Sequence, residues 1–257
     1  MARTEKPAFN SRLSPAADIE ASPRQVILNG IHKNFQEPSD RLTARQLLYI
    51  LGPHSVGAAI LSGAINFAIA VGLYGTTQES IHLFQFPNPL LGDAVVTIIL
   101  QCIITWLIEL ILVNLDLKNG AIQPVGGYSE PSNRLVRWFW FLDRDPVEAR
   151  RHVLFRWIEF VFWQAFRGFV VSVVSFALFA GPTIGFLALV GTPSGKDWVY
   201  TAALRPGIEN WKPMVFKAIL GASLGLLTTP LFALFWTVRC GWGLMNNEKN
   251  YGEKPGA

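Results

Sequence analysis

The sequence predicts an all-α, polytopic membrane protein with four transmembrane helices. Hydrophobic residues make up 51% of the 257 residues and charged residues only 16%, against roughly 25% charged in soluble domains. Four apolar runs approach the ~20 residues that a helix needs to cross a hydrocarbon core about 30 Å thick. They lie at about 54–75, 92–113, 168–190 and 214–238. Too few apolar residues remain elsewhere for a soluble core.

The first 45 residues are polar and contain several prolines. This composition predicts that residues 1–45 form a disordered tail, without a cleavable signal peptide. Ser14 and Ser22 each precede a proline and are candidate sites of proline-directed phosphorylation. Ordinary disordered Ser-Pro pairs are the alternative interpretation. A second, shorter tail is expected at 241–257.

The second span carries a line of polar residues. Every fourth position of "DAVVTIILQCIITWLIE" is polar, and residues four apart share one face of a helix. The line consists of Asp93, Thr97, Gln101, Thr105 and Glu109. Asn66 of the first span is a candidate to join it, and Lys217 in the first turn of span four matches Asp93 as an outer pair.

Two interpretations of this line remain open. Polar residues in a span can hydrogen-bond to closely packed neighbouring helices, which small residues such as those of "GASLG" at 221–225 also favour. Ionisable residues at membrane depth can instead mark a polar path or a lipid-headgroup site.

The segment 114–167 is predicted to be cytoplasmic and interfacial. Its "RWFWFLDRDP" is rich in aromatic rings, which favour the headgroup level. The helical pattern from Val153 to Val190 would be about 57 Å long at ~1.5 Å per residue, nearly twice the hydrocarbon core. We therefore expect an amphipathic helix that begins at Pro146, lies in the inner leaflet and turns near Gly168 into span three.

This expected helix carries a narrow polar stripe flanked by Phe, Trp and Val. Such a stripe indicates an embedded helix whose ionisable groups face protein or headgroups. Arg156 and Glu159 can pair at a spacing of three residues. Arg167 is expected to couple to Glu109 of span two, directly or through Glu159 or a bound headgroup. The stripe consists of His152, Arg156, Glu159, Trp163 and Arg167.

Positive charge predicts the orientation. Eighteen of the 22 lysines and arginines lie in the N-terminal tail, the segment 114–167 and the residues after 238, and none lies in the loop 76–91. Positively charged segments stay cytoplasmic, so both termini and the middle segment are expected there. The basic excess favours contact with anionic inner-leaflet lipid rather than nucleic acid, since no nucleic-acid-binding motif accompanies it.

Signals of catalysis and metal binding are missing from the sequence. The four histidines have no metal-ligand spacing, and there is no phosphate loop or nucleophile elbow. We therefore expect no metal, no cofactor and no enzymatic activity. Cys240, next to Arg239 at a membrane edge, is a candidate for palmitoylation. A small apolar residue in the last helical turn is the alternative.

The plan of a polar tail, four spans and a long basic loop bearing "GGYSEPSNRLVRWFWFLDRDP" resembles the uncharacterised four-span integral membrane proteins of fungi. The resemblance implies a fungal plasma membrane or endomembrane setting, the plasma membrane being favoured, and transfers no catalytic residues. We expect a scaffold or regulatory subunit that binds partner spans or anionic lipid through the inner-leaflet polar cluster, alone or as a homo-oligomer. The alternative is a small oligomeric transporter or channel that uses the span-two line as its path.

Overall fold

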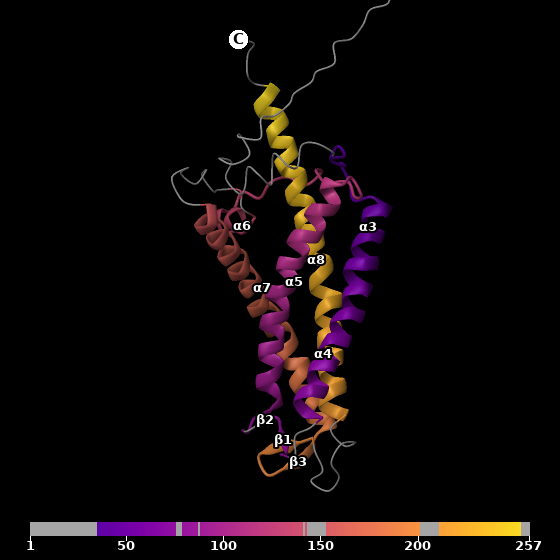
Figure 1. Ribbon diagram of the computed structural model, residues 1–257, viewed down its shortest axis with the longest axis vertical. Helices are drawn as coiled ribbons and strands as arrows, with labels where there is room; N and C mark the ends of the chain where they lie inside the picture. Colours follow the sequence, from indigo (N-terminus) through magenta and orange to yellow (C-terminus); the bar gives the residue numbers. More distant parts are fainter. Residues whose placement is uncertain are drawn as a thin grey trace, which may run out of the picture.

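Long helices dominate the chain (Figure 1). The computed structural model describes residues 35–75, 79–86, 88–140, 142, 153–200 and 211–252. In this part of the chain, four helical stretches are long and apolar enough to cross a membrane. They are Ala44–Tyr74, Leu90–Lys118, Trp157–Val190 and Trp211–Asn246. Each overlaps one of the four predicted spans and begins before it.

The first stretch is built from three consecutive elements, α3 (Ala44–Leu51), the π-helical turn η1 (Gly52–Gly57) and α4 (Ala58–Tyr74). It begins at Ala44 because Thr43 and Gln46 form a capping box, in which each side chain accepts from the other's backbone N–H. Pro53 lies in the first turn of η1. A proline has no N–H to donate within a regular helix, and here the helix accommodates it with a π-helical turn.

The residues before α3 pack against the loop that follows the second span. Ser39 N donates to Pro124 O at 2.9 Å, and Gln46 Nε2 donates to Gln123 O at 2.8 Å. The predicted disorder of 1–45 is therefore wrong for residues 35–45, because this backbone is paired. Ser14 and Ser22 lie outside the described residues.

The second span, α5 (Leu90–Lys118), packs against both α7 (Val153–Val190) and α8 (Trp211–Gly252), while α4 packs along α8. Two glycines of α8 permit the close approach of α4. A Cβ at Gly225 would lie 2.8 Å from Ala58 O, and a Cβ at Gly221 would overlap the Asn66 side chain. The small residues at 221–225 thus allow close interhelical packing, which was one of the two interpretations of the sequence.

A continuous α7 corrects the prediction of a separate amphipathic helix before span three. The helix runs from Val153 to Val190 without a turn at Gly168, and its N-terminal half leans away from the other long helices towards α6 (Arg134–Phe139) (Figure 1). A Cβ at Gly168 would lie 2.9 Å from Ile103 Cα. The glycine is therefore needed where α7 and α5 approach, not where the chain turns. The expected helix start at Pro146 lies outside the described residues.

A small β-sheet is the other departure from the all-α prediction. It lies at the end of the bundle opposite α6 (Figure 1). Its order is β2-β1-β4-β3, with β1 and β2 parallel and the other pairs antiparallel. The strands are β1 (Ile81–His82), β2 (Asn88–Pro89), β3 (Thr192–Ser194) and β4 (Asp197–Val199).

Buried groups hold the sheet to the bundle. The Asp197 carboxylate accepts from Phe84 N and Gln85 N. Burial, together with the nearby Asp197 carboxylate, raises the pKa of Tyr200 to about 12. The Tyr200 hydroxyl therefore stays protonated at neutral pH and donates to Leu187 O at 3.0 Å. The sheet thus connects the loop after the first span to the loop after the third.

Candidate functional site

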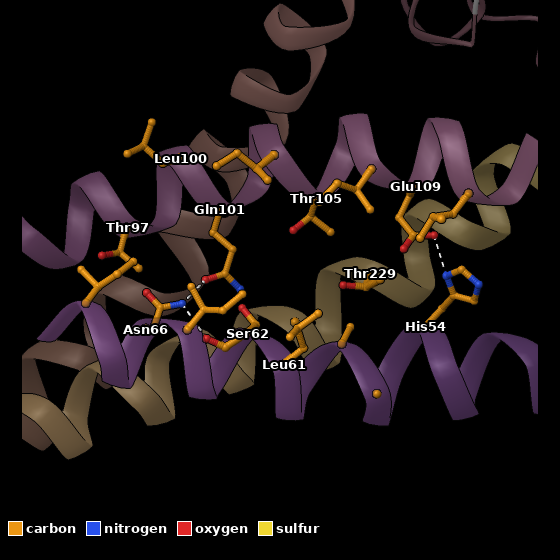
Figure 2. A pocket seen from close by; sticks show the side chains of 18 of the residues that line it. His54, Leu61, Ser62, Asn66, Thr97, Leu100, Gln101, Thr105, Glu109 and Thr229 are labelled. Carbon is orange, nitrogen blue, oxygen red and sulfur yellow. Dashed lines mark hydrogen bonds and ion pairs between the residues drawn. The ribbon is translucent and has the colours of Figure 1, made fainter. Parts of the chain in front are cut away.

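A groove of about 710 Å³ separates α4 from α5 along much of their length, and α8 contributes to its floor (Figure 2). Its walls are aliphatic side chains, each between 45% and 63% exposed. These are Leu61, Ile65, Ile69, Leu73, Val96, Leu100, Ile104, Ile108 and Leu112. The groove is therefore open along an apolar side, with its polar groups deeper inside.

The polar line of span two lies on this groove. Asp93, Thr97, Gln101, Thr105 and Glu109 all line it, as does Asn66 from α4. Regular spacing on one helix brought these residues together, so the sequence was sufficient to group them. What the sequence left open was which surface they would face.

A hydrogen-bonded bridge crosses the middle of the floor. Asn66 Nδ2 donates to Gln101 Oε1 at 3.0 Å, and Gln101 Nε2 donates to Gly221 O at 2.9 Å. Asn66 also donates to Ser62 O of its own helix. The bridge joins α4, α5 and α8 at one level, so these amides contribute to packing as well as to the lining.

The end of the groove nearest α3 contains a buried acid–histidine pair. His54 Nδ1 lies 2.6 Å from Glu109 Oε2, and both side chains are almost fully buried. Beside them the Tyr49 hydroxyl donates to Asp116 Oδ2 at 2.6 Å. Two acidic side chains, Glu109 and Asp116, thus line this end of the groove, hereafter the inner end.

The opposite, outer end holds the expected pair. Lys217 Nζ lies 2.6 Å from Asp93 Oδ1, and the Tyr74 hydroxyl donates to Asp93 Oδ2 at 2.8 Å. Lys217 is buried, so a paired carboxylate is what permits an ammonium at this depth. Within the described ranges, no three His, Cys, Asp or Glu side chains lie close enough together to hold a metal ion.

The predicted coupling of Glu109 to Arg167 is wrong, because Glu109 pairs with His54. Arg167 is fully buried and bonds to main-chain carbonyls instead. Its Nη2 donates to Trp138 O and its Nε to Phe139 O, both at 3.1 Å. It therefore holds α6 against α7.

Two further residues of the polar stripe, Trp163 and Glu159, are described by the structure and do not line the groove. Trp163 packs edge-on against Trp138, with 6.2 Å between ring centroids. Glu159 is half-buried. His152 and the side chain of Arg156 lie outside the described residues. The inner-leaflet cluster expected from the sequence is thus divided between the groove and the contact of α6 with α7.

Several polar groove residues escaped the sequence analysis, among them His54, Asp116 and Thr229. His54 lies inside the first predicted span, and an ionisable residue in a span is itself a signal of a partner or a site. Thr229 carries no such signal among the many threonines and serines of span four.

Cys240 is not an accessible thiol. It is buried in the cluster that contains Trp106 and Trp236. Since α8 continues to Gly252, this residue lies well inside the helix rather than in its last turn. The expectation of palmitoylation at this position is therefore wrong.

Comparison with known proteins points to fungi. The family described as "Protein of unknown function (DUF2456)" matches residues 137–236. An uncharacterized protein of Schizosaccharomyces pombe is 36% identical over 178 residues, which are 69% of this chain and 34% of that protein. One of Saccharomyces cerevisiae is 34% identical over 92 residues, which are 36% of this chain and 26% of that protein.

No solved structure matches the chain significantly. The chain spans about a third or less of the length of the two fungal relatives. The similarities support an uncharacterised fungal family, which agrees with the resemblance seen in the sequence. The relatives' names state no activity that could be carried to this chain.

Proposed function

We propose that this chain is an integral membrane protein that binds a membrane lipid in the groove between its first two spans. A role as a membrane scaffold or accessory subunit would then depend on the bound lipid. The observation that carries the proposal is the groove itself, which combines exposed aliphatic walls with a buried polar floor.

The walls of the groove favour a lipid chain. They lie in the part of α4 and α5 that would be in the bilayer, where exposed aliphatic side chains meet acyl chains. A volume of about 710 Å³ is within the range of roughly 300 to 1,000 Å³ for small-molecule sites. A single acyl chain can therefore enter from the side, with its headgroup at one of the polar ends.

A partner span is the alternative occupant that the sequence analysis offered. A helix about 10 Å across would lie on the open aliphatic side of the groove, whereas an acyl chain can also reach the buried polar floor.

The orientation proposed here follows the charges. The inner end, with His54 and Asp116, lies on the side of α6 and the C-terminal end of α8 (Figure 1). Basic residues concentrate in the segments on this side, which favours the cytoplasm. We favour the plasma membrane as the location, with an endomembrane as the alternative.

Lipid binding is tested by filling the groove. Leu100→Trp should lower the amount of lipid that co-purifies in detergent, measured by mass spectrometry per mole of folded protein, because the indole occupies the space of the chain. Leu178→Trp is the matched control, since Leu178 is an exposed leucine of α7 outside the groove. Equal lipid in both variants and the wild type would contradict the proposal.

A small transporter or channel is the second candidate. It is favoured by the polar line of span two, which follows the groove from Asp93 to Glu109, about 24 Å at the helical rise. In proteoliposomes this function predicts ion flux above that of empty vesicles, lowered by Gln101→Leu. Lipid binding without any flux would exclude it.

A further inference from the structure

We propose that the inner end of the groove binds the protonated amine of an amphiphile, with Glu109 as its counter-ion. This inference rests on the proposed lipid-binding function and names the headgroup chemistry of the ligand. It departs from the anionic lipid expected from the sequence.

The first support is the charge at the two ends of the groove. At the outer end, Lys217 neutralises Asp93 at 2.6 Å. At the inner end, the lining residues include two acidic side chains, Glu109 and Asp116, and one imidazole, that of His54, which pairs with Glu109. Acidic side chains therefore outnumber basic ones among the lining residues of this end. An ammonium is attracted to such an end, while a phosphate without a compensating cation is repelled.

The second support is the unfilled hydrogen-bonding capacity of Glu109. Its Oε2 lies 2.6 Å from His54 Nδ1 and, apart from this contact, has no hydrogen-bond partner among the residues that the structure describes. Figure 2 shows the carboxylate on the groove side of α5. The residue is only 3% exposed. A buried carboxylate left partly unsatisfied is costly, so a donor supplied by a ligand would stabilise it.

The third support is an unpartnered hydroxyl that lines the same groove. Thr229 is 2% exposed, and its Oγ1 finds no hydrogen-bond partner in the described part of the chain. Thr229 lines the same groove as Glu109, and Figure 2 shows its oxygen turned into it. An ammonium carries three donors. The Glu109 carboxylate and Thr229 Oγ1 supply acceptors from two different helices, α5 and α8.

Other headgroup classes fit less well. Among the groove's described lining residues, Lys217 is the one permanent cation, and it is both paired and at the far end. An uncharged hydroxyl could satisfy Thr229 but would bring no positive charge to the acidic side chains of Glu109 and Asp116. The aliphatic walls then hold the chain of the amphiphile while its amine lies at the inner end.

The test uses probes that differ only in the headgroup. The purified full-length protein is incubated with hexadecylamine or hexadecanol, and native mass spectrometry counts the bound molecules. We expect a preference for the amine of about tenfold or more, as for other desolvated charge pairs. In nanodiscs, retention of phosphatidylethanolamine over phosphatidylglycerol distinguishes a lipid headgroup from a free long-chain amine.

Two variants locate the amine. Glu109→Gln should abolish the preference, so that the amine and the alcohol bind equally, and its unfolding temperature in detergent reports whether the variant is folded. Thr229→Val should weaken binding of the amine severalfold. The matched control is Thr228→Val, because the neighbouring Thr228 hydroxyl already donates to Leu224 O at 2.7 Å. If Glu109→Gln does not fold, the wild-type preference and the response of Thr229→Val decide.

The outcomes separate the inference from the function beneath it. Equal binding of amine and alcohol by the wild type, or a preference that survives Glu109→Gln, overturns the amine site and leaves the lipid groove standing. Binding of neither probe, together with lipid content unchanged by Leu100→Trp, overturns the groove itself.

Discussion

At the scale of single residues, Arg167 and Glu109 show how a buried charge finds a partner. The Arg167 guanidinium donates to backbone carbonyls of α6, and its Cζ lies 4.8 Å from the centroid of the Trp138 ring. The Glu109 carboxylate lies against the His54 imidazole. Both arrangements give a buried ionisable group a partner at low dielectric.

Arg167→Gln should destabilise the protein by about 2 kcal/mol or more, because hydrogen bonds to a charged donor contribute roughly 1.5 to 3 kcal/mol. The change would leave the carbonyls of Trp138 and Phe139 without their donor. Thermal unfolding in detergent measures the loss.

Arg137→Gln is the control for this prediction. Arg137 lies 3.5 Å from Glu130, and both side chains are more than a quarter exposed. Such a pair contributes at most about 1 kcal/mol. Similar unfolding temperatures for the two variants would show that Arg167 does not anchor α6.

At the scale of elements, the contact of α7 with α5 depends on Gly168. A Cβ at position 168 would lie 2.9 Å from Ile103 Cα of α5, and a backbone atom cannot move aside as a side chain can. By contrast, a Cβ at Gly181 of the same helix would meet nothing within 4 Å.

Gly168→Ala is therefore expected to cost roughly 1 to 3 kcal/mol of stability, as overpacking does. Gly181→Ala should be neutral or stabilising by up to about 1 kcal/mol, since alanine favours the helix. Unfolding temperatures of the two variants make the comparison, and an equal response would mean that the helices are not in close contact.

At the scale of the whole molecule, the sheet and α6 mark the two ends of the bundle (Figure 1). The sheet joins two loops that carry few basic residues, and α6 lies among segments that carry many. If the bundle spans a membrane as proposed, the charge pattern predicts an orientation with the sheet outside.

This orientation predicts which positions an impermeant thiol reagent reaches. In a cysteine-free background, Ser80→Cys and Ser194→Cys should be labelled in intact cells if the protein is in the plasma membrane, and Ser132→Cys should not. For an endomembrane location, sealed vesicles of known sidedness give the same contrast. Labelling of Ser132→Cys alone would reverse the topology.

The sequence by itself determined the four apolar spans and the polar line on the second one, because length, composition and a spacing of four residues are properties of a single helix. The sequence also predicted that Asp93 pairs with Lys217, since both lie at the ends of spans on the same side of the membrane. These inferences need no knowledge of which helix faces which.

Tertiary structure alone decided the partners of the interior charges. His54 and Glu109 are far apart in the chain, and a π-helical turn sets where the imidazole lies. Arg167 could bind any acceptor near its depth, and the position of α6 selected carbonyls. The strands are only two or three residues long, too short for a periodic signal, and exist because two loops meet. Contacts between helices depend on their relative rotation and tilt, which packing fixes and local sequence does not.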